Sequence, residues 1–276
     1  MDPPELVCTI LRTPAFRAAS ANRAIVAETI VFLFGGILGT LHHLYWTGTP
    51  TAILALGIDG YFNWMSRLIP AVAVPAAEDA PLLERIAKIG IIPGQIITRS
   101  LALVPSIEEG VVVSDTDQDI LKMAVIERHR ATGNVGLGLV QGLRLARGAL
   151  ATSVAHDSHN IIVVGTEDIE MLAAVTAIRE MNGGLVAVEE GRVLASLPLP
   201  VAGLLSEGHM QEVAEGLEEC IDAAHRLGCK LEDPFMTLSF LSLPVIPELK
   251  LTDRGLVDVK AFRFVPLFLG DAEKCQ

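Results

Sequence analysis

The sequence predicts a mixed α/β (α+β) fold, in which helices flank a mixed β-sheet and a mainly helical N-terminal region precedes them. Two observations support this prediction. Residues 95–270 alternate strand-like apolar runs with amphipathic helical patterns, as expected for a sheet covered by helices. Residues 1–94 instead combine one long apolar run with short elements and a proline-rich stretch, which are too short to build a core of their own.

Residues 24–46 form the long apolar run of the N-terminal region. A helix needs about 20 apolar residues to cross a bilayer, so the run is long enough to do so. It also contains Glu28 and the pair His42–His43, which cost free energy in lipid unless they face a partner or a cofactor. A membrane helix and a buried helix of a soluble domain both remain open, and we do not favour membrane contact.

Residues 70–81 are rich in proline and alanine and are expected to form a linker, because proline interrupts a helix. Residues 81–90 then predict a short helix that begins at Pro81 and ends at Gly90. We therefore place the boundary between the helical region and the sheet domain after residue 94.

The sheet domain is predicted from the period of its apolar residues. Strands are expected at residues 122–129, 135–143 and 160–165, and a hairpin at residues 183–197 that turns at Glu189–Arg192. Helices are expected at residues 166–181 and 207–227. In the first helix, Thr166 is the predicted N-cap, and Ile169, Leu172, Ala173 and Ile178 form the predicted apolar stripe.

The charge and the cysteine pattern restrict the class of protein. The net charge is −12 and no cluster of Lys and Arg is present, so we expect no nucleic-acid partner. The four cysteines form no CxxC pair, which favours free thiols in a reducing compartment. Residues 1–20 lack the apolar core of a secretory signal, and a cytoplasmic location is expected.

The run A-H-D-S-H-N carries the first candidate site, with His156, Asp157 and His159. Two imidazoles and a carboxylate supply most of a metal site, which normally needs three or four ligands. They also allow a general acid–base pair, with Asp157 orienting one histidine. The alternative is a polar turn whose side chains bond their own backbone, and the pattern taken alone slightly favours that turn.

Two further groups are weaker candidates. Glu127, Arg128 and His129 end a predicted strand, where they would contact an anion or a substrate, or simply form a solvated strand end. The pair His42–His43 is a weak metal candidate, because a third ligand would have to come from elsewhere in the chain.

Three long runs of the sequence support a specific family resemblance. They are D-I-L-K-M-A-V-I-E-R-H-R-A-T-G-N-V-G-L-G, G-A-L-A-T-S-V-A-H-D-S-H-N-I-I-V-V-G-T, and L-E-D-P-F-M-T-L-S-F-L-S-L-P-V-I-P-E-L-K-L-T-D-R-G-L-V-D-V. With them, residues 91–268 closely resemble the C-terminal domain of adenine deaminase. The resemblance implies a metal-dependent aminohydrolase of purine metabolism, within the amidohydrolase superfamily, that converts adenine and water into hypoxanthine and ammonia.

The same resemblance implies a manganese or iron site in a (β/α)8 barrel placed before this domain, and a homo-oligomer. The chain departs from that pattern, because no H-x-H motif precedes residue 95 and a barrel needs about 250 residues. We therefore expect no complete TIM barrel, no metal in this chain, and no deamination by the chain alone. The resemblance implies that His156, Asp157 and His159 face the active site of the full enzyme. The alternative is a non-catalytic module that binds a purine or assists assembly.

The N-terminal region resembles other proteins. The run F-L-F-G-G-I-L-G-T-L-H-H-L-Y-W-T-G-T-P is similar to a transmembrane segment of quinol-dependent nitric oxide reductase, in which His42 and His43 would match ligands of the non-haem iron. The remaining ligands of that family are absent. The segment from Y-F-N-W-M-S-R-L to I-I-P-G-Q resembles an uncharacterised bacterial family. A fusion, a truncated or misassembled reading frame and a chimera would each give this mosaic, and a membrane-anchored redox fragment is a further hypothesis.

Overall fold

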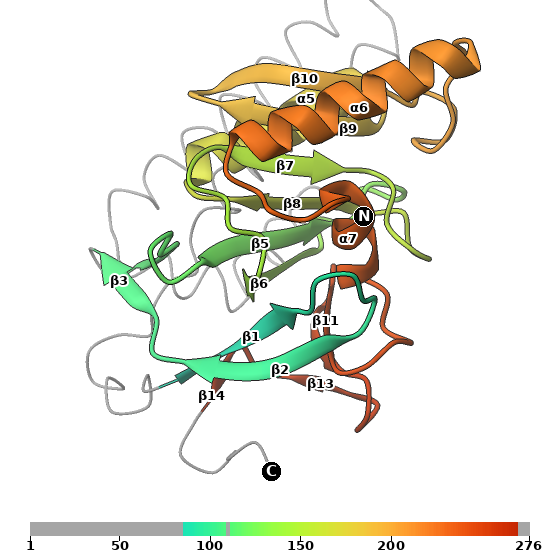
Figure 1. The fold of residues 1–276 in the computed structure, drawn as a ribbon. Coiled ribbons are helices and arrows are strands. Elements are labelled where there is room, and N and C mark those ends of the chain that lie inside the picture. Colours follow the sequence, from blue (N-terminus) through green and yellow to red (C-terminus); the bar gives the residue numbers. More distant parts are fainter. Residues whose placement is uncertain (1–84, 109–110, 270–276) are drawn as a thin grey trace, which may run out of the picture. The chain divides into compact units, whose positions relative to one another are not determined.

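A nine-stranded mixed sheet is the centre of the domain (Figure 1). The computed structural model describes residues 85–108 and 111–269. The sheet order is β10-β9-β7-β8-β5-β6-β1-β14, with β2 also paired to β1. Its strands are β1 (Arg85–Ile91), β2 (Thr98–Leu103), β5 (Ile120–Ile126), β6 (Val135–Gln141), β7 (Ala149–Thr152), β8 (Ile161–Gly165), β9 (Gly184–Glu189), β10 (Arg192–Pro198) and β14 (Phe268–Leu269). In the described residues the sheet is open, and the predicted mixed α+β fold is confirmed.

Two smaller sheets and three helices complete the described part of the chain. Strands β3 (Ser106–Glu108) and β4 (Val111–Val113) form one pair, and β11 (Leu249–Thr252), β12 (Gly255–Asp258) and β13 (Arg263–Val265) form the other sheet. The helices are α5 (Asp168–Glu180), α6 (Met210–Arg226) and α7 (Pro234–Leu241). In Figure 1, α6 lies in front of the β9–β10 end of the sheet and α5 lies behind it.

The middle of the sheet is covered on both faces. Every residue of β5, β7 and β8 is buried, which is typical of strands with packed layers on either side. Leu150, Ile162 and Leu185 belong to a core cluster that also contains Cys220 and Ala223 of α6. This double burial fixes the register of the central strands, because a shift by one residue would exchange the two faces.

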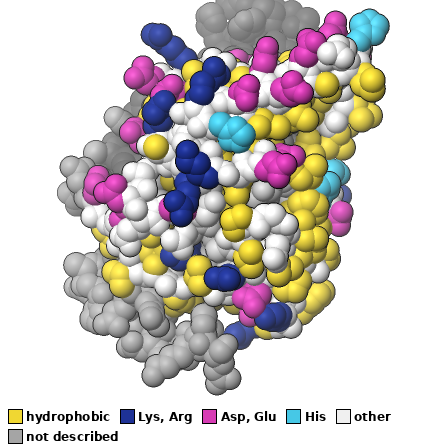
Figure 2. Space-filling view, viewed as in Figure 1, with side chains coloured by type: hydrophobic (Ala, Val, Ile, Leu, Met, Phe, Trp, Pro, Cys, Tyr) yellow, Lys and Arg dark blue, Asp and Glu magenta, His cyan; other side chains and the backbone are white. Residues whose placement is uncertain are grey.

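Helix α6 buries one stripe and leaves the opposite face in water. Its buried residues are Cys220, Ala223 and Ala224, and burial raises the pKa of the Cys220 thiol to about 12. Figure 2 shows acidic side chains along this helix, and the exposed ones are Glu212, Glu215, Glu218, Glu219 and Asp222. A helix of this kind is an ordinary amphipathic cover for a sheet.

The hairpin prediction is confirmed by β9 and β10. Their turn residues, Glu190 and Gly191, have φ values of 51° and 69°, as a two-residue turn between twisted strands requires. The predicted start of α5 was wrong, because the N-cap is Glu167. The Thr166 hydroxyl instead donates to the Gly148 carbonyl at 3.3 Å.

The predicted apolar stripe of α5 was also wrong in part. Ile169 is 60% exposed, whereas Met171, Ala174, Val175 and Ile178 are buried. The N-cap lies one residue later than expected, and the buried face of the helix is set by packing against β7, β8 and β9. Periodicity alone did not separate two neighbouring stripes that both contain apolar residues.

Residues 85–91 form strand β1, although the sequence predicted a helix over residues 81–90. Strand β1 pairs antiparallel with β2 and β14 and parallel with β6. Ile86 and Ile89 are fully buried, and β-branched residues pack well on a pleated surface. Pairing with strands far along the chain therefore outweighed local helical preference, and the sheet begins before the predicted boundary at residue 94.

Several predictions fall on residues outside the described ranges. They are the apolar run 24–46, the pair His42–His43 and the linker 70–81. Within residues 85–108 and 111–269, no helix is both long enough and apolar enough to span a bilayer.

Lys250 is a charged side chain inside the domain. It lies on β11, is 0% exposed, and its Nζ donates to the Ile96 carbonyl at 2.9 Å. Burial lowers the pKa of Lys250 to about 8. At neutral pH the folded protein therefore either keeps a charge in an apolar place or releases a proton, and both cost free energy.

Replacing this buried amine tests that cost. Because the unfolded chain holds the Lys250 proton up to its ordinary pKa of 10.5, wild-type stability should rise as the pH rises from about 8 toward 10.5. Lys250→Met should raise the free energy of unfolding at pH 7 by about 1–3 kcal/mol, and the gain should shrink at pH 9.5. Urea unfolding at both pH values measures this. A less stable variant at pH 7 would show that the bond to Ile96 outweighs the buried charge.

Candidate functional site

Two loops that are separate in sequence leave the sheet at the same edge. Strand β5 pairs with β8 through Ile126 and Ile161, and β7 pairs with β8 through Thr152 and Ile162. The loop after β5 and the loop before β8 must therefore meet. In Figure 1 the arrowheads of β5 and β7 both point toward α7, which lies beside this edge. The structure thus brings together the predicted groups Glu127–His129 and His156–His159.

Glu127 organises the loop that follows β5. Its carboxylate accepts hydrogen bonds from the main-chain N–H groups of His129 (2.5 Å), Arg130 (2.8 Å) and Thr132 (2.9 Å), and from the Thr132 hydroxyl (2.9 Å). Burial alone raises the pKa of Glu127, but these bonds outweigh it and hold the pKa below its ordinary value. The carboxylate is therefore occupied by its own loop.

Arg128 ties three loops together. Its Nε donates to the His159 carbonyl and its Nη2 to the Ala202 carbonyl, each at 2.6 Å. Gly203 lets the backbone lie against the guanidinium, since a Cβ there would be 2.5 Å from Nη2. Residues 127–134, 153–160 and 199–205 are thereby joined at one point.

His129 makes a second tie between the first two loops. Its Nε2 lies 2.8 Å from the Ser158 carbonyl. A carbonyl only accepts, so Nε2 carries the proton in this contact. The ring is otherwise exposed. It belongs to the rim of the site, the name used here for residues 127–134 and 153–160 together.

His156 packs against α7. Its main-chain N–H donates to the Ser239 carbonyl at 3.2 Å, and its ring centroid lies 4.7 Å from that of Phe240. The rings of His156 and His159 are 6.4 Å apart between centroids, in an edge-to-face arrangement. Asp157 between them is exposed. The run A-H-D-S-H-N is thus a turn, and that turn brings the two imidazoles close together.

His159 has the most unusual surroundings of the three. Its backbone has a φ of 50°, a left-handed conformation that few residues other than glycine adopt. Burial lowers the pKa of His159, and the positive neighbours His156, Arg128 and His129 lower it further, whereas Asp157 acts in the opposite direction.

Two neighbouring polar atoms of this turn are buried without a hydrogen-bond partner. They are Nδ1 of His159 and Oδ1 of Asn160, and Asn160 is only 4% exposed. Buried polar atoms are nearly always paired, so unpaired ones mark a place that a ligand, a water molecule or a partner completes.

The turn does not form a metal centre by itself. Among the described residues, no three side chains of His, Cys, Asp or Glu are grouped so that they could hold an ion. The arrangement instead offers hydrogen-bonding groups at a shared rim.

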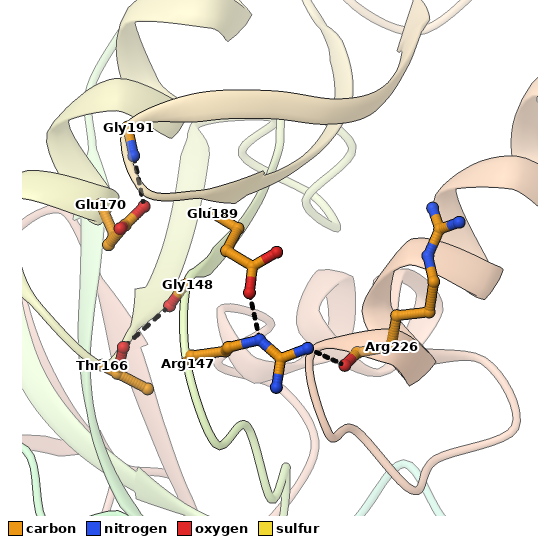
Figure 3. A network of polar contacts seen from close by, with 7 residues as sticks. All are labelled: Arg147, Gly148, Thr166, Glu170, Glu189, Gly191 and Arg226. Carbon is orange, nitrogen blue, oxygen red and sulfur yellow. Dashed lines mark hydrogen bonds and ion pairs between the residues drawn. The ribbon is translucent and has the colours of Figure 1, made fainter.

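A second polar network lies at the opposite edge of the sheet (Figure 3). Arg147 pairs with Glu189 through Nε, and its Nη2 donates to the Arg226 carbonyl at 3.0 Å. Glu170 accepts from the Gly191 N–H at 3.2 Å, and this network borders a cavity of about 610 Å³. These contacts join the segment before β7, the β9–β10 hairpin, α5 and the end of α6.

Sequence reasoning missed the role of residues 199–205 and of α7 in the first site. Nothing in the spacing of Ala202 or Phe240 relates them to the histidines. Arg128 was considered as a substrate contact, but two of its donors are bound to main-chain carbonyls. The one feature of the sequence that pointed to this site was the charged cluster at the end of a predicted strand.

Glu127→Gln tests whether this carboxylate builds its loop. The amide accepts fewer and weaker bonds, so the free energy of unfolding should fall by about 1–2 kcal/mol at pH 7. Because the folded pKa of Glu127 is lowered, the difference should be full above its ordinary value of 4.5 and disappear as the pH falls through the lowered value. Urea unfolding at pH 7 and pH 3 measures it. Glu207→Gln, at an exposed position, is the control, and an equal loss in both variants would refute the assignment.

Comparison with known proteins identifies matching sequences. Residues 95–263 match the family model described as adenine deaminase C-terminal domain. A protein named adenine deaminase from Methanothrix thermoacetophila is 60% identical over 190 residues, which cover 68% of this chain and 33% of that protein. One with the same name from Dehalococcoides mccartyi is 54% identical over 178 residues, covering 64% and 31%. One from Brucella anthropi is 50% identical over 177 residues, with the same coverage. The chain spans about one third of the length of these relatives.

Proposed function

Because the chain belongs to the adenine deaminase C-terminal domain family, we propose that its sheet domain serves an enzyme that converts adenine and water into hypoxanthine and ammonia. The observation that carries this proposal is the meeting of residues 127–134 and 153–160 at one edge of the sheet. Both loops lie inside the matched residues, and both are rich in hydrogen-bonding side chains.

In this proposal His156, Asp157 and His159 face the purine site of the complete enzyme. Their support is that the rings of His156 and His159 lie 6.4 Å apart between centroids and that Asp157, between them in the sequence, is exposed. The unpaired Oδ1 of Asn160 is a second support, because buried polar atoms are nearly always paired and a ligand or a water molecule would complete it. Glu127 and Arg128 shape this rim.

Within the described residues, no three side chains of His, Cys, Asp or Glu are grouped so that they could bind manganese or iron, the ions implied by the resemblance. We place the metal in a part of the enzyme that corresponds to the other two thirds of the relatives, and we assign no metal-dependent step to the residues described. The rim then completes or covers a site whose reacting centre lies on another polypeptide segment.

A non-catalytic role is the second candidate. It is supported by the hydrogen bonds of Arg128 and His129, which join three loops through main-chain carbonyls. The two candidates differ in what the rim contributes to turnover.

A reconstitution experiment separates them. The purified chain would be mixed with the Methanothrix relative lacking its matched C-terminal residues, with Mn²⁺ and adenine present, and ammonia release would be followed. We expect little release from either part alone and clear release from the mixture. Release by the chain alone would overturn the view that the reacting centre lies elsewhere. No release from a mixture whose parts are folded and bind each other would refute the deaminase assignment.

A histidine variant in the same assay tests the rim. His159→Ala should lower the restored rate about tenfold or more, the effect of losing one hydrogen bond to the ligand, without weakening association of the two parts. His225→Gln, at the far end of α6, is the matched control and should leave the rate unchanged. Equal rates for the two variants would favour the assembly role.

A further inference from the structure

The two ring nitrogens of His159 lie in different surroundings. Nδ1 is enclosed and has no hydrogen-bond partner. Nε2 is not among the enclosed unpaired atoms, and the residue as a whole is half-buried. Nδ1 is therefore the ring nitrogen that the protein encloses without a partner.

This difference selects a tautomer. An enclosed N–H group without an acceptor costs about 1–3 kcal/mol, and such groups are rarer in proteins than unpaired acceptors. The proton of a neutral His159 ring therefore belongs on Nε2. A charged ring would carry an N–H at Nδ1 as well, so the enclosure also disfavours the imidazolium.

The charges around the ring act in the same direction. Electrostatic repulsion also lowers the pKa of His159. It comes from His156 in the same turn and from Arg128 and His129 in the loop after β5. Asp157 opposes them, and it is exposed. The adjoining α7 and residues 199–205 contribute no ionisable side chain.

Arg128 fixes the ring in these surroundings. It holds the His159 carbonyl from one side while its other donor is anchored on Ala202. The left-handed backbone of His159, with a φ of 50°, is an unfavourable conformation that needs such support. Gly203 allows the close approach of the guanidinium to the third loop.

We propose that His159 is a neutral hydrogen-bond donor, with Nε2–H directed at an acceptor atom of the ligand, and that Arg128 is the positioning residue that holds it in this state. The ligand chemistry is a heteroaromatic ring nitrogen or an exocyclic oxygen. Only this identification of the ligand rests on the proposed function. The state of the ring rests on the enclosure of Nδ1 and on the Arg128 contacts.

This assignment excludes two other roles for His159. A metal ligand would offer the Nε2 lone pair and would need an acceptor for an Nδ1 proton, and Nδ1 has none. A proton shuttle would have to become charged, and the enclosure opposes that. A neutral imidazole can still polarise a bound acceptor through its N–H.

Nitrogen-15 spectra of the histidine rings in the purified full chain test the proposal. At pH 7 we expect the Nε2–H tautomer for His159 and a titration midpoint below the ordinary value of 6.5. Arg128→Ala should raise that midpoint, because a positive neighbour is removed. Arg128→Lys keeps the charge but cannot donate to both carbonyls, so the midpoint should stay low while the ring populates both tautomers. Arg130→Ala, at the exposed residue two positions along, should change neither.

Several results would overturn the proposal. They are an Nδ1–H tautomer, a wild-type midpoint at or above 6.5, or an Arg128→Ala variant with native amide spectra and an unchanged ring. Adenine is added in a separate arm, in which the Nε2–H signal should shift at pH 7. An unmoved signal on a ring in the expected tautomer would contradict the proposed purine ligand, while the state of the ring would stand.

Discussion

The pairing of β8 with both β5 and β7 is the constraint on which the rest of the site depends. These three strands are buried along their whole length, and any slip in register would exchange their two packed faces. With the register fixed, Ile126 and Ile161 stand opposite each other, and the loops beyond them have to share one edge. The rim is therefore a product of sheet packing, and Arg128 only completes what the strands have already brought close.

Much of the sheet domain could be predicted from the sequence, because its strands and helices have clear periods. The β9–β10 hairpin, β8 and α6 follow directly from apolar spacing and turn residues. Strand β1 could not be predicted, because two of its three partners, β6 and β14, are distant in the chain. The buried stripe of α5 was misplaced for a related reason, since packing chose Met171 over Ile169.

The candidate site, like the fold, could be predicted from the sequence only in part. Its histidines and Arg128 stand out as polar residues at the ends of strands, so the sequence could propose them. What it could not supply is their relation: the 2.6 Å bond from Arg128 to the His159 carbonyl joins residues 31 positions apart. The enclosure of Nδ1 of His159 likewise appears only in the folded chain. The turn and the site were offered as alternatives, and the structure shows a turn whose geometry builds the rim.

The central claim is that this rim, formed by residues 127–134 and 153–160, is where the domain meets a purine. Mapping the amide chemical shifts of the purified chain while adenine is added tests it most directly. We expect the largest changes on these two loops and on residues 199–205. Changes centred on Arg147 and Glu189 at the opposite edge of the sheet, or no changes at all, would contradict it.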